Sequence, residues 1–181
     1  LTHLLNHSLF KGLLFLGAGA IQTGSGVRDL ERLGGLIHRM PRTSILMLIG
    51  CMSIAAVPPL NGFTGEWLLF QALLNLGAAI THVRSGILAG SAAAMLALTS
   101  ALAIACFVRV FGIGFLAQPQ SEEAKGAREV PASMIGGMGV LASGCVLLGL
   151  VPHLLLQLLR PVSEQLVGTT ARPSLGVTPA S

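Results

Sequence analysis

Charged residues are scarce in this chain, which excludes an ordinary water-soluble domain. They make up 10% of its 181 residues, whereas hydrophobic residues make up 52%, and a soluble domain carries about 25% charged residues. A helix that crosses the hydrocarbon core of a membrane needs about 20 mostly apolar residues. Four apolar stretches within residues 1–151 meet this requirement, so the composition predicts an all-α, multi-pass membrane helix bundle.

Three further absences narrow the class of protein. The basic residues form no stripe with interleaved aromatics, which argues against nucleic-acid binding. There is no initiator Met, basic n-region or cleavage site, so we expect no signal peptide and interpret the chain as the C-terminal part of a longer protein. The cysteines have no paired spacing, which argues against a metal site or a disulfide framework, and they are Cys51, Cys106 and Cys145.

The apolar stretches are joined by two charged connections, residues 22–42 and 118–131. Within the first connection, apolar residues at helical spacing predict a short helix on the membrane surface, namely Leu30, Leu33, Ile37 and Met40. Residues 1–151 are therefore expected to form the transmembrane domain. Residues 152–181 are expected to form an interfacial segment followed by a disordered tail from Gly168.

The second stretch, residues 43–80, is too long for one straight span. A continuous helix of that length would measure about 57 Å, nearly twice the thickness of the hydrocarbon core. Pro58, Pro59, Asn61 and Gly62 supply a break, because proline removes backbone donors and disrupts a helix. Either this is one discontinuous transmembrane helix, or it is a hairpin of two short spans, and the distribution of positive charge in the loops does not separate the two.

Four polar residues in the spans are candidates for proton transfer. His3, His7 and Lys11 recur every four residues, which places them on one face of the first helix. Glu66 is the single charge in the second stretch, and an ionised carboxylate at that depth is costly unless it is neutralised or paired. No nucleophile lies beside a base, so we expect no covalent active site and no catalytic residue of this chain's own.

Simpler roles for these residues stay open. The histidines could lie at headgroup level while Lys11 extends toward the interface, as long cationic side chains do. Lys11 and Glu66 could also form an interhelical ion pair that only fixes packing. Unwound backbone beside an acidic residue at membrane depth is, however, a recurring design of ion sites in transporters.

Three passages resemble the proton antiporter-like family, which includes membrane subunits of complex I, group 4 hydrogenases, formate hydrogenlyase and multisubunit cation antiporters. They are HLLNHSLFKGLLFLG at residues 3–17, RDLERLGGL at residues 28–36 and PPLNGFTGEW at residues 58–67. The resemblance covers residues 1–151 and is strongest to the hydrogenase and formate hydrogenlyase branch. It implies that residues 43–80 form a discontinuous span.

The resemblance also implies a function. His3, His7 and Lys11 would form a central hydrophilic axis, and Glu66 would exchange protons in the outlet half-channel of a redox-driven complex in the inner membrane. The chain would hold no cofactor or metal of its own. Its partners would be the lipid bilayer, other membrane subunits and a peripheral arm with iron-sulfur and nickel-iron centres. The alternatives are a subunit of a multisubunit Na+/H+ antiporter, and a non-conducting scaffold that anchors a peripheral enzyme.

Overall fold

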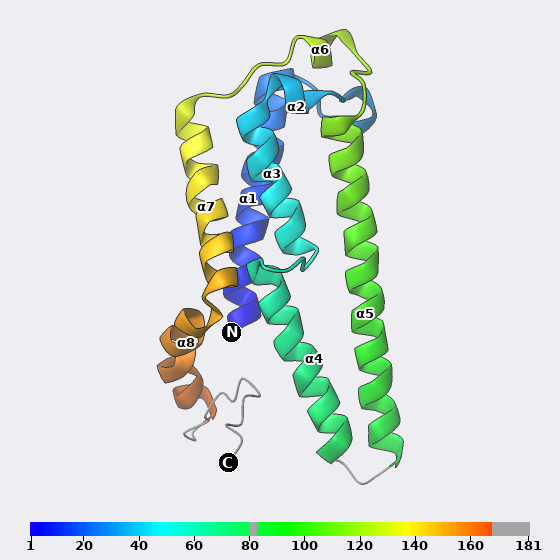
Figure 1. The fold of residues 1–181 in the computed structure, drawn as a ribbon, viewed down its shortest axis with the longest axis vertical. Helices are drawn as coiled ribbons and strands as arrows, with labels where there is room; N and C mark the ends of the chain where they lie inside the picture. The colour runs from blue at the N-terminus through cyan, green and yellow to red at the C-terminus, as the bar shows by residue number, and fades with distance from the viewer. Residues whose placement is uncertain (80–82, 168–181) are drawn as a thin grey trace.

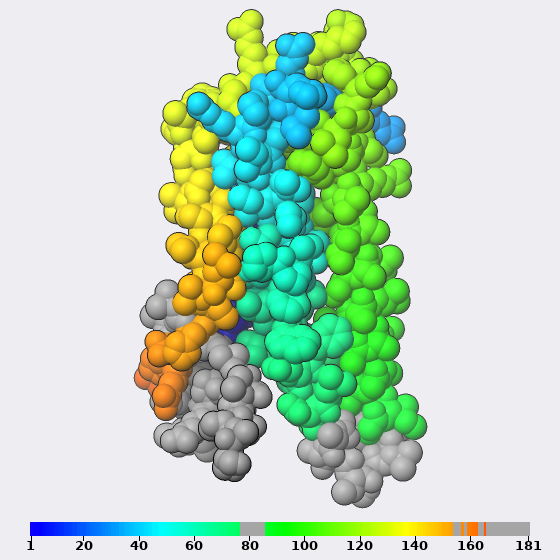
Figure 2. Space-filling model, viewed as in Figure 1, coloured from blue at the N-terminus to red at the C-terminus, as the bar shows by residue number. Residues whose placement is uncertain are grey.

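The computed structural model describes residues 1–79 and 83–167, and this part of the chain is an all-α bundle, as predicted. Its long helices run along a common axis (Figure 1). Figure 2 shows α5 along one side of the bundle and α7 along the other, with α3 and α4 between them. In chain order the elements are α1 (Thr2–Ser25), η1 (Leu30–Arg32), α2 (Leu36–Arg39), α3 (Pro41–Ile54), α4 (Asn61–Ala79), α5 (Val83–Phe111), η2 (Gly112–Leu116), α6 (Glu122–Lys125), α7 (Ala132–Leu150) and α8 (Pro152–Val167).

Three of the described helical segments are long and apolar enough to cross a membrane on their own. They are Thr2–Ser25, Gly86–Leu116 and Ala132–Leu150. The shorter apolar helix α3 is followed by α4, and these two helices together make the second predicted span. The sequence placed the fourth stretch, residues 132–151, within one residue of α7, whereas α1 continues four residues past the predicted end at Ile21.

The break in the second span is real, and the hairpin alternative is wrong. Helix α3 ends at Ile54, α4 begins at Asn61, and the two run in the same direction (Figure 1). Asn61 and Gly62 were predicted to lie in the break but belong to the first turn of α4. A Cβ atom at Gly62 would overlap the backbone oxygen of Ser53, so the two half-helices meet at a distance that only glycine permits.

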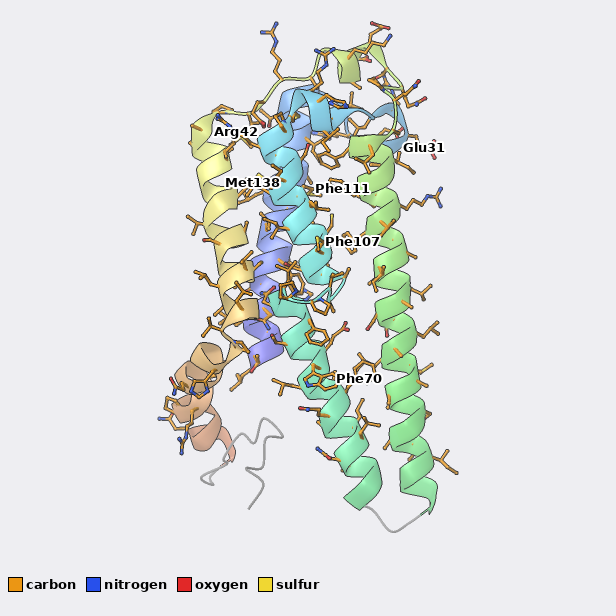
Figure 3. All side chains as sticks on the ribbon, viewed as in Figure 1. Glu31, Arg42, Phe70, Phe107, Phe111 and Met138 are labelled. Atoms are coloured by element: carbon orange, nitrogen blue, oxygen red, sulfur yellow. The ribbon has the colours of Figure 1, made fainter. Side chains whose placement is uncertain are left out.

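Helix α1 lies at the centre of the bundle, where it packs against α3 and α7. Phe10 and Leu13 of α1 are buried together with Met47 of α3 and Met138 of α7. Figure 3 shows Met138 on α7, and also Phe107 and Phe111, which come from α5. The apolar core therefore holds α1, α3, α5 and α7 together, which fixes the position of the break.

The charged connections 22–42 and 118–131 meet at one end of the bundle. Arg32 forms an ion pair with Glu123, with 2.9 Å between Nη2 and Oε1. The backbone N–H of Arg128 donates to the oxygen of Gly24 at 3.0 Å. The backbone N–H of Glu123 and the positive charge of Arg32 hold the pKa of the Glu123 carboxyl group below its ordinary value. Both connections thus lie on the same side of the bundle, as a discontinuous second span requires, and we predict that this side faces the cytoplasm.

The second connection also caps helix α3. The Glu129 carboxylate accepts a hydrogen bond from the backbone N–H of Arg42 at 2.9 Å and another from the Thr43 hydroxyl. The first N–H groups of a helix lack intrahelical partners and favour a negative charge nearby. Because Met40, at the N-cap position, supplies no side-chain bond, a residue distant in the sequence takes this role.

The surface helix predicted for the first connection is wrong in detail. The segment forms two short pieces, η1 and α2, separated by Gly34 and Gly35, whose φ angles are 131° and 66°. Leu33 and Met40 are both buried in the apolar core, which also contains Ala127 and Val130 of the second connection. The periodic apolar residues are therefore buried within the protein and do not face lipid headgroups. The two glycines with positive φ angles prevent one continuous helix.

The segment after the last span is helical over its described part. Helix α8 covers Pro152–Val167 and includes Pro161. It begins where α7 ends, at the end of the bundle opposite the charged connections (Figure 1). The interfacial role of this segment stays a prediction, and the predicted tail from Gly168 lies outside the described residues.

Candidate functional site

His3, His7 and Lys11 lie on one face of α1, as their spacing predicts. The ring centroids of His3 and His7 are 5.8 Å apart, and the ring of His7 meets that of Phe10 edge-on at 5.1 Å. Both histidines are exposed and Lys11 is half-buried. The ammonium of Lys11 lies 6.0 Å from the centroid of the Phe15 ring. The other described residues thus leave much of this polar face uncovered.

Glu66 lies on α4, close after the break, and its side chain is half-buried. Its carboxylate oxygen Oε2 accepts a hydrogen bond from the hydroxyl of Ser100 on α5, with 2.8 Å between the oxygens. Among the described residues, Glu66 takes part in no ion pair. The direct partner of Glu66 is therefore a hydroxyl group from a neighbouring helix, and Lys11 forms no ion pair with it.

The polar face of α1 approaches α4 beside Glu66. A Cβ atom placed on Gly65 would lie 3.1 Å from Nδ1 of His3, so the imidazole rests against the backbone next to Glu66. Lys11 lies eight positions further along α1, which is about 12 Å of helix. The structure thus brings His3 to the turn that carries Glu66 and places Lys11 further along the bundle.

A hydrogen-bonded cluster of Asn6, Asn61 and Thr64 joins α1 to the start of α4. The Asn6 amide donates to the backbone oxygen of Asn61 at 2.8 Å, and the Asn61 amide donates to Oδ1 of Asn6 at 3.3 Å. The Thr64 hydroxyl donates to the backbone oxygen of Asn61 at 2.7 Å. Both asparagines are fully buried. Oδ1 of Asn61 has no partner among the described protein atoms, and buried oxygens of this kind commonly bind an internal water.

Asn6 and Ser100 are the polar residues near the site that the sequence analysis missed. Asn6 shares the buried face of α1 with Phe10, Leu13 and Gly17, a helical spacing that is visible in the sequence. A primary amide in that apolar row must find a hydrogen-bonding partner, and this was the available signal. Ser100 had no comparable signal, because a serine in a span can bond to its own helix.

Comparison with known proteins agrees with this architecture. Residues 1–90 match the model of a family described as NADH:quinone oxidoreductase/Mrp antiporter, transmembrane region. Hydrogenase-4 component B of Escherichia coli K12 is 49% identical over 150 residues, which are 83% of this chain and 22% of that protein. Formate hydrogenlyase subunit 3 of the same organism is 46% identical over 162 residues, or 88% of this chain and 26% of that protein.

A solved structure shows the same fold. The Mrp complex from Dietzia sp. DQ12-45-1b contains a chain that superimposes with a TM-score of 0.72 at 25% identity, over 87% of this chain and 36% of that one. The chain spans about a quarter of the length of the two curated relatives above. Through residues 1–90, this multi-pass membrane chain belongs to the transmembrane family of NADH:quinone oxidoreductase and Mrp antiporter subunits, as its motifs predict.

Proposed function

We propose that the chain carries the proton outlet of a membrane subunit in a redox-driven complex. In this proposal protons pass along the face of α1 that carries Lys11, His7 and His3 to Glu66, which lies beside His3 and exchanges them with water on the exit side. The relatives named as hydrogenase and formate hydrogenlyase components support a redox partner. That partner would be a peripheral arm with iron-sulfur and nickel-iron centres, held by other membrane subunits.

The observation that carries the proposal is the environment of Glu66. It is half-buried beside a helix break, and its carboxylate is hydrogen-bonded to Ser100 instead of being ion-paired. A buried carboxylate in an ion pair tends to stay ionised. A carboxyl group whose partner is a hydroxyl can bind and release a proton without breaking an ion pair, as proton exchange requires.

Two competing functions make different demands on the same residues. A scaffold needs the polar groups only to hold helices together, and the Asn6 to Asn61 contact does this without any ionisable group. A subunit of a multisubunit Na+/H+ antiporter would use the same path without a redox partner, and the similarity to the Mrp complex favours that alternative.

The test is Glu66→Gln in the complete polypeptide within its assembled complex. Gln preserves the shape of the side chain and accepts the bond from Ser100, but it cannot release a proton. We expect the complex to assemble and to lose proton uptake into inverted vesicles, while Glu66→Asp retains part of it. Full uptake by Glu66→Gln would refute the proposal, and uptake driven by a Na+ gradient without a redox substrate would favour the antiporter.

A further inference from the structure

The hydroxyl group of Ser100 lies between two acceptors. Helices α4 and α5 run side by side (Figure 1), and Oγ of Ser100 is 2.8 Å from Oε2 of Glu66 and 2.9 Å from the backbone oxygen of Leu96. A serine hydroxyl has one proton to donate and two lone pairs with which to accept. At any moment Ser100 can therefore donate to Glu66 or to Leu96.

This arrangement suits both protonation states of Glu66. When Glu66 is ionised, Ser100 donates its proton to the carboxylate. When Glu66 is protonated, the carboxyl O–H donates to Oγ of Ser100, and the Ser100 proton turns toward the oxygen of Leu96. Ser100 keeps its own proton in both states, and Glu66 gains or loses one. Neither helix has to move, because the same oxygen-oxygen distances serve both states.

We propose that Ser100 is a positioning residue that hydrogen-bonds Glu66 in its ionised and protonated states and so enables it to exchange protons at membrane depth. This inference rests on the proposed function of Glu66 and extends it to a second residue. A serine with a purely structural role would need only the bond to its own helix, as neighbouring Thr99 has with the backbone oxygen of Met95.

The other elements packed on α4 leave Ser100 as the direct partner. Helix α1 presents His3, whose ring rests on Gly65, together with His7 and Lys11. Among the described side chains of α5, Arg109 is the charged one, and it lies nine positions past Ser100, about 14 Å along the helix. Helix α7 carries no Asp, Glu, Lys, Arg or His, and Arg42 of α3 lies at the far end of that helix.

The test compares Ser100→Ala with the matched control Thr99→Ala in the complete protein within its complex. The infrared C=O stretch of protonated Glu66 is identified as the band that Glu66→Gln abolishes. In Ser100→Ala we expect this band to move to higher frequency, because the carboxyl group of Glu66 has lost its hydrogen-bonding partner. Proton uptake should fall about tenfold, and Thr99→Ala should change neither quantity.

A conservative variant completes the test, and proton uptake is expressed per amount of assembled complex for every variant. Ser100→Thr keeps the hydroxyl and should restore both the band and the uptake. If Ser100→Ala leaves the Glu66 band unmoved while Glu66→Gln abolishes uptake, the role of Ser100 is wrong and the proposed function stands. If Glu66→Gln transports normally while Ser100→Ala shifts the band, the proposed function fails and the hydrogen bond stands without a transport role.

Discussion

The side-chain amide of Asn6 donates a hydrogen bond to the backbone oxygen of Asn61 across 55 positions of sequence, so α1 directly supports the first turn of α4. Replacing Asn6 with Ala would leave the Asn61 oxygen and amide with fewer partners in a fully buried place. We expect the loss to lower the free energy of unfolding by about 1–3 kcal/mol. The measurement is the midpoint of unfolding in mixed micelles.

The control for Asn6→Ala is Ser8→Ala. Ser8 lies two positions along the same helix, is exposed, and donates to the backbone oxygen of Leu5 in its own helix. We expect its replacement to change the free energy of unfolding by less than about 0.5 kcal/mol. If the two variants are equally stable, the link between α1 and α4 contributes nothing to stability.

The sequence predicted the features whose signals are local. The prolines of residues 58–59 marked the break, and the charged connections marked the ends of the spans, because proline geometry and the cost of charge in lipid act where the residues stand. His3, His7 and Lys11 were correctly placed on one helix face, because their four-residue spacing is also a local signal. The extent of the break was wrong by two residues, since Asn61 and Gly62 continue into α4.

The sequence could not supply the partners of these residues. Ser100 contacts Glu66 across 34 positions, and Glu129 caps α3 across 87 positions. Such pairings depend on how whole helices dock, which spacing within one helix does not contain. The surface helix predicted for residues 30–40 failed for a related reason, because apolar periodicity fits burial under a neighbouring loop as well as burial in lipid.

Close packing of α7 on the break gives a second prediction. A Cβ atom at Gly149 would lie 2.6 Å from the carbonyl carbon of Leu60 and 2.7 Å from the backbone nitrogen of Asn61. Backbone atoms cannot rotate away as a side chain can, so Gly149→Ala has to push α7 outward. We expect a loss of about 1–3 kcal/mol in the free energy of unfolding, measured as for Asn6→Ala.

Gly139→Ala is the matched control on the same helix. A Cβ atom at Gly139 meets nothing within 4 Å, and Ala loses less conformational freedom than Gly when a helix forms. This variant should be as stable as the parent protein or slightly more stable. Equal stability of Gly149→Ala and Gly139→Ala would show that α7 does not press on the break in the membrane.

The arrangement of the charged connections predicts the topology. In a background whose three native cysteines are replaced, single cysteines are placed at Arg39 and Arg128, which are exposed in the two connections, and at Val162 in α8. Helix α7 crosses the membrane once between Arg128 and Val162. The cysteines at positions 39 and 128 should therefore react with a membrane-impermeant maleimide from the cytoplasmic side, and the cysteine at position 162 from the other side. Labelling of Arg39→Cys and Arg128→Cys from opposite sides would contradict the discontinuous span.

The last prediction separates transport from scaffolding by the relative effects of Lys11→Ala and Glu66→Gln. If the residues form a proton path, both variants should assemble and both should lose most proton uptake, because one removes a mid-span cation and the other a titrating group.

If the residues serve only as interhelical contacts, Glu66→Gln should have a mild effect, since Gln still accepts the hydrogen bond from Ser100. Lys11→Ala would then act mainly on assembly, by removing the alkyl chain and ammonium that lie near Phe15. Proton uptake divided by the amount of assembled complex therefore distinguishes the two roles, and unchanged uptake per complex in both variants would favour the scaffold.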